Sequence, residues 1–292
     1  MFDKVTVVCI ASSYGVALLL EISRLFFRLP VRLVVMLGFG GAGLLAHSIV
    51  LWRDSQAGFA ENVPLSSWHL WYLLAAWILA VVYLVLAGAR PQASIGIFML
   101  PMILGLVFAA HVAQTTSFSR GHATQSWGMI HGIALLLGTV TASLGFVAGL
   151  MYLVQSYRLK HKLPPRPGFR LPSLEWLQVV NKQMLYASSL FVAGGMFAGI
   201  ILNIIRQDIP WTDRVVISSG VLLAWLFVAT LFELLYKPAQ QGRKVAYLTV
   251  ASFVFLAMVL ALALSSDSPH ARGDAFSGAS KATTSSFSEE RP

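Results

Sequence analysis

Charged residues are scarce in this sequence, and the motifs of soluble catalysis are missing. Only 11% of the 292 residues are charged, whereas a soluble domain carries about 25%. The one cysteine, Cys9, lies within an apolar run, so a disulfide framework, a Cys-x-x-Cys motif and a zinc site are excluded. A lysine-bearing phosphate loop and a His-Glu-x-x-His motif are absent as well. With 57% hydrophobic residues, the composition indicates a polytopic membrane protein, which we expect not to be an enzyme.

Long apolar runs take up most of the chain. Each is of a length that can cross a bilayer, which needs about 20 residues, and backbone groups in lipid must be satisfied within the segment. We therefore predict an all-α bundle of eight transmembrane helices over 1–264, followed by a disordered tail over 265–292 whose composition supports no core. The eight runs are about 5–22, 31–52, 69–89, 93–113, 128–154, 184–205, 214–235 and 245–264.

The basic residues predict the orientation. The net charge of +9 comes from short joints between apolar runs, so it indicates topology and no nucleic-acid partner. Joints 1–2, 3–4, 5–6 and 7–8 hold 13 Lys and Arg, whereas the N-terminus and the other joints hold 5. The positive-inside rule then places both termini on the outer side.

Joint 5–6 and the glycines predict local features of the bundle. The proline-rich stretch LPPRPGFRLP precedes SLEWLQVVNKQ, in which Ser173 is a plausible N-cap, so we expect a short interfacial helix before run six. Two Gly-x-x-x-Gly pairs, Gly145 with Gly149 and Gly195 with Gly199, fit close helix packing. Glu233, an acid within run seven, needs a basic partner from the inner joints, such as Lys237.

Histidines and tryptophans gather on the predicted outer side. Interfacial hydrogen bonding and the aromatic belt of a bilayer account for each one singly. As a set, however, neutral imidazoles beside aromatic rings suit the iron and the planar ring of haem. The six outer histidines are His47, His69, His111, His122, His131 and His270, and the tryptophans at that boundary are Trp52, Trp68, Trp71, Trp127 and Trp211.

Four stretches of the sequence carry a family resemblance. Run five, IHGIALLLGTVTASLGFVAGLMYLVQSYRLKHK, resembles the histidine-bearing helix of the cytochrome c assembly family, which includes CcsA, CcmC and HemX-like proteins. The continuation LPSLEWLQVVNKQMLYASSLFVAGGMFAGIIL resembles its next segment, and GLLAHSIVLW with SSWHLWYLLAAW resembles the eight-span HemX-like and YpjD-like branch. The resemblance covers residues 5–264.

The resemblance implies a set of haem-binding positions. In the family, a tryptophan-rich outer loop holds haem between flanking histidines. The matching loop, IPWTDR, keeps Trp211 and Asp213 and lacks the other tryptophan and the Pro-Lys-Glu that follow in active members. His131 matches the first flanking histidine, and the second falls near His270, with His47 as another candidate opposite His131. The expected cofactor is haem b.

The resemblance therefore predicts a multi-pass protein of the inner (cytoplasmic) membrane that handles haem at its outer face during cytochrome c maturation. The expected partners are membrane lipid, haem and other cytochrome c assembly proteins. Two alternatives stay open. One is a haem-free regulator of tetrapyrrole synthesis, with the basic joint 5–6 as its interaction surface. The other is a subunit of a larger transport or assembly complex, held by the glycine-lined helices.

Overall fold

The computed structural model describes residues 7–26, 32–60, 67–113, 126–164, 168–206, 211–235 and 242–264. These residues form helices and connecting turns, with no strand among them. The tail predicted over 265–292, which includes His270, lies outside the described residues, as does Lys237. The helices are α1 (Val7–Ser23), α2 (Arg32–Ala60), α3 (Trp68–Ala89), α4 (Gly96–Val112), α6 (Ser126–Lys160), α7 (Leu174–Arg206), α8 (Arg214–Leu235) and α9 (Gly242–Leu264).

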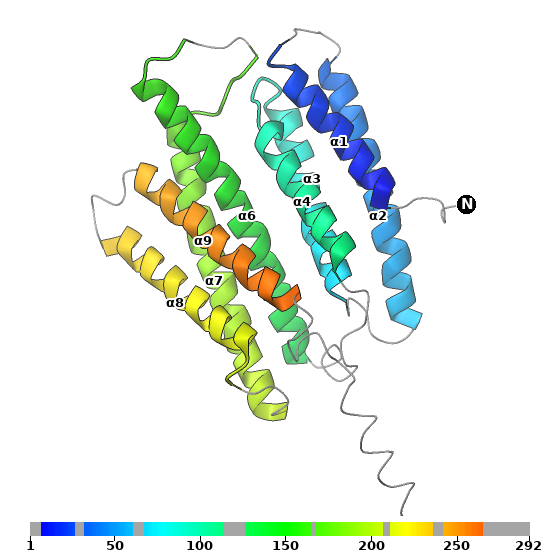
Figure 1. Cartoon of the computed structure of the whole chain (residues 1–292), viewed down its shortest axis with the longest axis vertical. Coiled ribbons are helices and arrows are strands. Elements are labelled where there is room, and N and C mark those ends of the chain that lie inside the picture. Colours follow the sequence, from blue (N-terminus) through cyan, green and yellow to red (C-terminus); the bar gives the residue numbers. More distant parts are fainter. Residues whose placement is uncertain are drawn as a thin grey trace, which may run out of the picture.

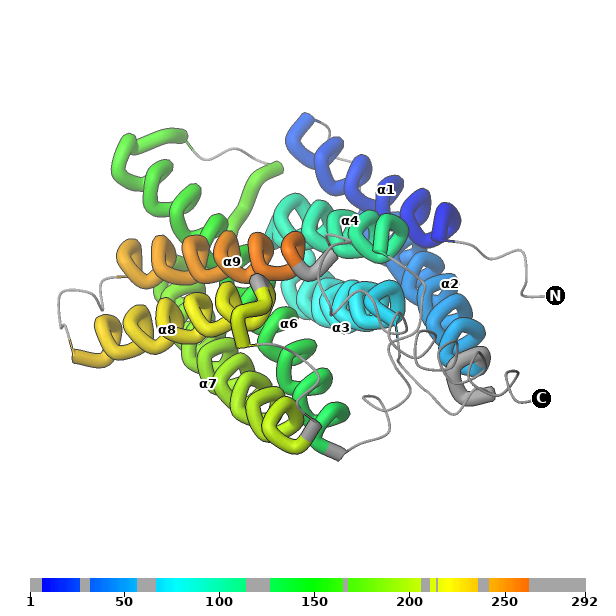
Figure 2. Tube along the Cα trace, turned by 60° about the horizontal axis from the view of Figure 1, so that its bottom comes forward, coloured from blue at the N-terminus to red at the C-terminus, as the bar shows by residue number. Residues whose placement is uncertain are grey.

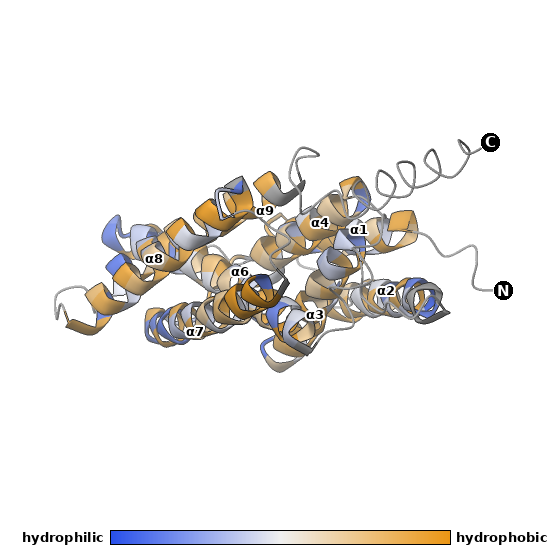
Figure 3. Cartoon of the chain, turned by 90° about the horizontal axis from the view of Figure 1, so that it is seen from below, coloured by the Kyte–Doolittle hydropathy of each residue, from blue (hydrophilic) through white to orange (hydrophobic). Residues whose placement is uncertain are grey.

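The helices follow the eight apolar runs, and six of them are long and apolar enough to cross a membrane. The other two, α1 and α4, have 17 residues each, which at 1.5 Å per residue gives about 25 Å of helix. Hydrophobic residues run along α8 and α9 (Figure 3). The all-helical membrane fold is thus confirmed, whereas the number of crossings and the side on which the termini lie stay predictions.

Two helix groups share α6 (Figures 1 and 2). The larger core cluster draws most of its buried residues from α1 to α4 and from α6, including Tyr14, Tyr83 and Met151, and adds Leu177 of α7 and Ala246 of α9. The smaller cluster joins α6, α7, α8 and α9 through residues such as Leu185 and Leu226. Helix α6 contacts α3 and α4 of the first group as well as α7 and α9 of the second, so it joins the two groups.

Glycines bring the helices of the second group close together. A Cβ added at Gly149 would lie 2.8 Å from Thr249 Oγ1 of α9, and one at Gly145 would lie 3.2 Å from Met184 Cβ of α7. On α7, a Cβ at Gly195 would lie 2.8 Å from a methyl carbon of Leu135. The close packing that the Gly-x-x-x-Gly pairs predict is therefore confirmed.

Helix α7 begins earlier than the apolar run that predicts it. Ser173 caps it, because the Trp176 N–H donates to Ser173 Oγ at 3.3 Å. The separate interfacial helix expected over SLEWLQVVNKQ is wrong, since α7 continues unbroken to Arg206. Nothing in this stretch breaks a helix, and its polar Asn181 is buried and accepts a hydrogen bond from the Thr249 hydroxyl at 3.3 Å.

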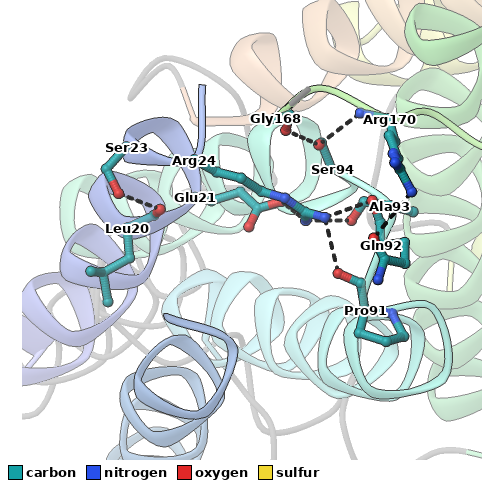
Figure 4. A network of polar contacts seen from close by, with 10 residues as sticks. All are labelled: Leu20, Glu21, Ser23, Arg24, Pro91, Gln92, Ala93, Ser94, Gly168 and Arg170. Carbon is teal, nitrogen blue, oxygen red and sulfur yellow. Dashed lines mark hydrogen bonds and ion pairs between the residues drawn. The ribbon is translucent and has the colours of Figure 1, made fainter. Parts of the chain in front are cut away.

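Residues of three joints meet at one end of the bundle (Figure 4). We call it the basic end and define it by Arg24, Arg90, Arg158 and Arg170. The Arg24 guanidinium donates to the carbonyl oxygens of Pro91, Gln92 and Ala93 at 3.1, 2.6 and 3.2 Å.

Joint 5–6 is connected to the basic end by hydrogen bonds from Ser94 of joint 3–4. The Ser94 hydroxyl donates to the Gly168 carbonyl at 3.1 Å, and its backbone N–H donates to the Arg170 carbonyl at 2.7 Å. A Cβ added at Gly168 would overlap the carbonyl oxygen of Arg24, so only glycine fits there. These hydrogen bonds hold joints 1–2, 3–4 and 5–6 together as one layer.

Candidate functional site

His131 lies in the second turn of α6, at the end of the bundle opposite the basic end. Its Nδ1 lies 2.7 Å from the carbonyl oxygen of Gly195 on α7. A carbonyl only accepts hydrogen bonds, so Nδ1 carries the hydrogen and donates it. In the neutral ring the lone pair is then on Nε2, which has no hydrogen bond among the described residues. Metal-binding histidines in proteins are oriented in this way, by a backbone carbonyl on the other ring nitrogen.

The glycines of α7 provide the space for this ring. A Cβ added at Gly199 would lie 2.7 Å from His131 Nδ1 and 2.8 Å from its Cε1. Gly195 presents the carbonyl that fixes the ring, one turn earlier on the same face. The small residues of VAGGMFAG therefore serve the histidine as well as helix packing, a role that the sequence pattern alone did not predict.

Trp71 of α3 packs against α6 at Gly132, the residue after His131. A Cβ added at Gly132 would lie 2.8 Å from two ring carbons of Trp71. The sequence placed this tryptophan at the outer boundary with others, yet it did not single it out as a site residue. The available signal was the glycine directly after His131, which leaves room for a large ring on the neighbouring face of α6.

His47 lies in a different part of the bundle from His131. It is fully buried on α2, and its Nδ1 is 3.4 Å from the Tyr14 hydroxyl of α1. Its Nε2 is buried and makes no hydrogen bond of acceptable geometry among the described residues. No described contact joins His47 to His131, whose ring contacts are with α7. The structure thus places both candidate ligands within helices without bringing them together.

The loop before α8 holds the other two described site residues. Trp211 is 55% exposed, and no described contact places it on the His131 ring. Asp213 is the N-cap of α8: its Oδ1 accepts hydrogen bonds from the backbone N–H groups of Val215 at 2.9 Å and Val216 at 3.4 Å. Asp213 therefore has a structural role in starting the helix.

His69 is already paired, unlike His131. Its Nδ1 lies 2.7 Å from the Ala110 carbonyl, and its Nε2 lies 3.5 Å from Asp54 Oδ2. Both ring nitrogens have partners, so His69 is a poor ligand candidate. Within the described ranges, no cluster of three or more His, Cys, Asp or Glu residues could hold a metal ion.

Glu233 of α8 has the basic partner that its burial requires. Its side chain is fully buried, and Oε1 lies 3.0 Å from the Lys182 Nζ of α7. Oε2 accepts a hydrogen bond from the Tyr186 hydroxyl. Lys182 belongs to the basic joint 5–6, so the predicted pairing with a residue of the inner joints is confirmed, with a different residue from Lys237.

The residues around His131 fit one axial position of a haem. They supply an imidazole with an oriented Nδ1–H and an Nε2 that makes no hydrogen bond among the described residues. A second axial ligand is not found beside it among the described residues.

Several apolar helices of spanning length define a multi-pass membrane protein. Within that class, the model of the cytochrome C assembly protein family matches residues 68–267, and the chain belongs to that family. Nothing among curated proteins or solved structures matches it. The matched region begins at Trp68, so it contains α3 to α9, with His131, Trp71, Trp211 and Asp213, and leaves α1 and α2 outside.

Proposed function

We propose that this protein binds haem b at the end of the bundle that holds His131, on the outer face of the cytoplasmic membrane, during cytochrome c maturation. Family membership fits a role in that process. One observation carries the haem proposal: the Nδ1–H of His131 donates to the Gly195 carbonyl at 2.7 Å, which leaves the Nε2 lone pair for iron. The role is binding and transfer, without a catalysed reaction.

The remaining residues have separate tasks in this proposal. Trp71, which packs against α6 at Gly132, holds the helix that carries the imidazole, and Trp211, being exposed, is available to cover a bound ring. Asp213 positions the loop through its capping of α8. His47 and His270 remain the two candidates for the second axial ligand, and other cytochrome c assembly proteins are the expected recipients or donors of haem.

An optical spectrum of the purified protein with added haem tests the proposal. We expect a Soret band and low-spin visible bands for the native chain, and a loss of most of this absorbance in His131→Ala. The matched control is His111→Ala, in the last turn of α4, which changes an exposed histidine at the same end. Equal absorbance in both variants contradicts ligation by His131.

The second ligand is identified by the same measurement. If His47 or His270 binds iron, its replacement by alanine converts the low-spin spectrum to a high-spin one. A spectrum that stays low-spin in both variants assigns the position to neither residue.

The alternative is a haem-free, HemX-like regulator of tetrapyrrole synthesis. It is favoured by the contacts of Trp211 and Asp213 in the loop before α8, which are not those of a haem-binding loop. Asp213 is engaged in capping, and Trp211 lacks a described contact with His131. Cells without this protein discriminate the two functions. Loss of covalent haem from c-type cytochromes, with unchanged porphyrin content, supports haem handling, whereas altered porphyrin content with normal cytochromes supports the regulator.

A further inference from the structure

A small pocket lies between α6 and α9 near the basic end, far along α6 from His131. Its volume is about 320 Å³, and it opens to the surface of the bundle. Leu153, Val154 and Tyr157 of α6 line one side, and Arg243 and Tyr247 of α9 line the other. This volume is at the lower end of the range of ligand pockets, which suits a headgroup better than a large planar cofactor.

The lining changes from apolar to polar along the helix axes. Leu153 and Val154 lie deeper in the apolar part of α6, while Tyr157 is one turn nearer to its basic end. On α9, Arg243 is in the first turn and Tyr247 follows four residues later on the same face. Tyr157 and Tyr247 are each more than half exposed. The pocket is thus amphipathic at the depth where a membrane-spanning helix leaves the hydrocarbon.

The charge that lines the pocket is positive, and no described residue compensates it. Arg243 has no ion pair or hydrogen bond with any described residue, and no carboxylate lines the pocket. Glu233, the buried acid of α8, is occupied by Lys182. Arg243 and the adjacent Lys244 also begin α9, where the helix dipole already has its positive end, so an anion there is stabilised by both.

We propose that this pocket binds the phosphate of an anionic phospholipid. The guanidinium of Arg243 pairs with the phosphate oxygens, for which its planar fork is suited. The hydroxyls of Tyr157 and Tyr247 donate to the headgroup, and an acyl chain lies over Leu153 and Val154. The apolar floor selects a lipid over a free anion, and basic pockets between membrane helices take such headgroups. The lipid joins α6 to α9, independently of haem binding at the other end.

Lipid retention measured by native mass spectrometry tests this site. The full-length protein in detergent is mixed with phosphatidylglycerol or with phosphatidylcholine, and the bound lipid is counted. We expect phosphatidylglycerol to be retained at least tenfold more strongly. In Arg243→Gln that preference falls about tenfold, equivalent to about 1.4 kcal/mol. The matched control Lys160→Gln removes an exposed charge at the end of α6 outside the pocket, and it changes retention less than twofold.

A second variant tests the cavity apart from its charge. Leu153→Trp fills the pocket and leaves Arg243 in place, so we expect it to lower phosphatidylglycerol retention as well; unchanged retention refutes the pocket. Equal retention of the two lipids by the native chain overturns the proposal. So does an equal effect of Lys160→Gln and Arg243→Gln, which indicates diffuse surface charge. Displacement of the lipid by millimolar inorganic phosphate assigns the site to a small anion and also overturns it.

Discussion

Removing the amine of Lys182 is expected to destabilise the contact between α7 and α8. Glu233 is fully buried, and its Oε1 lies 3.0 Å from Lys182 Nζ as an ion pair without hydrogen-bond geometry. In Lys182→Met the carboxylate keeps only the Tyr186 hydroxyl. Breaking a buried pair costs about 3–5 kcal/mol, whereas exposed pairs contribute about 0–1 kcal/mol. Because the Lys182 side chain is 42% exposed, we expect a loss of about 2 kcal/mol.

A double-mutant cycle measures this coupling. The unfolding free energies of Lys182→Met, Glu233→Gln and the double variant are determined by titrating detergent-solubilised protein with a denaturing detergent and following helicity by circular dichroism. The double variant is expected to be more stable than Lys182→Met alone, because no unpaired charge remains buried. Lys160→Met, an exposed lysine at the end of α6, is the control and should change stability by less than about 0.5 kcal/mol. Single effects that add within about 0.5 kcal/mol refute the ion pair.

Two further predictions concern glycines. Gly168→Ala places a methyl group on a carbonyl oxygen of joint 1–2, so it should lower the unfolding free energy by about 1–3 kcal/mol. The control Gly88→Ala, at a position with open space in α3, should be neutral or stabilising in the same denaturing-detergent titration. Gly199→Ala displaces the His131 ring, so the Soret absorbance of the haem-loaded protein should fall, while Gly194→Ala, one of the α7 glycines with no neighbour within 4 Å, should retain it. A Gly199→Ala protein with native absorbance contradicts the role of that glycine in positioning the imidazole.

The helices were predictable because their lipid-facing sides must be apolar. Hydropathy located all eight, yet it missed three polar helix ends. Helix α2 continues to Ala60, α6 continues to Lys160, and α7 already begins at Leu174. Those ends contain good helix formers that are too polar to belong to the apolar run. A hydrophobic run therefore marks the segment suited to lipid and underestimates the length of the helix. The orientation relative to the membrane rests on the basic joints alone and stays a prediction.

The site was predictable only in part, since a sequence pattern does not show which helix faces which. His131 was found because it is one of the histidines on the predicted outer side and matches a family position. Trp71 and Gly199 were missed, as their significance depends on packing of α3 and α7 against α6. His47 was grouped with His131 by depth, whereas its contacts are with Tyr14 of α1. The position of a residue along its helix is thus readable from sequence, and the rotation of the helix about its axis is not.

The hydrogen bonds of the basic end imply an order of assembly during synthesis. Arg24 donates to backbone acceptors that follow it by 67 to 69 residues, and the Ser94 hydroxyl donates to an acceptor 74 residues later. Helices α1 and α2 are therefore synthesised before the backbone acceptors of Arg24. Likewise, joint 3–4 is synthesised before residues 168–170, with which Ser94 forms its hydrogen bonds. Since chains fold from the N-terminus as they are made, this layer closes only after α6 has inserted. Arg24 lies between α1 and α2, which the family match does not cover. Its hydrogen bonds tie these two helices to the later helices of the matched region.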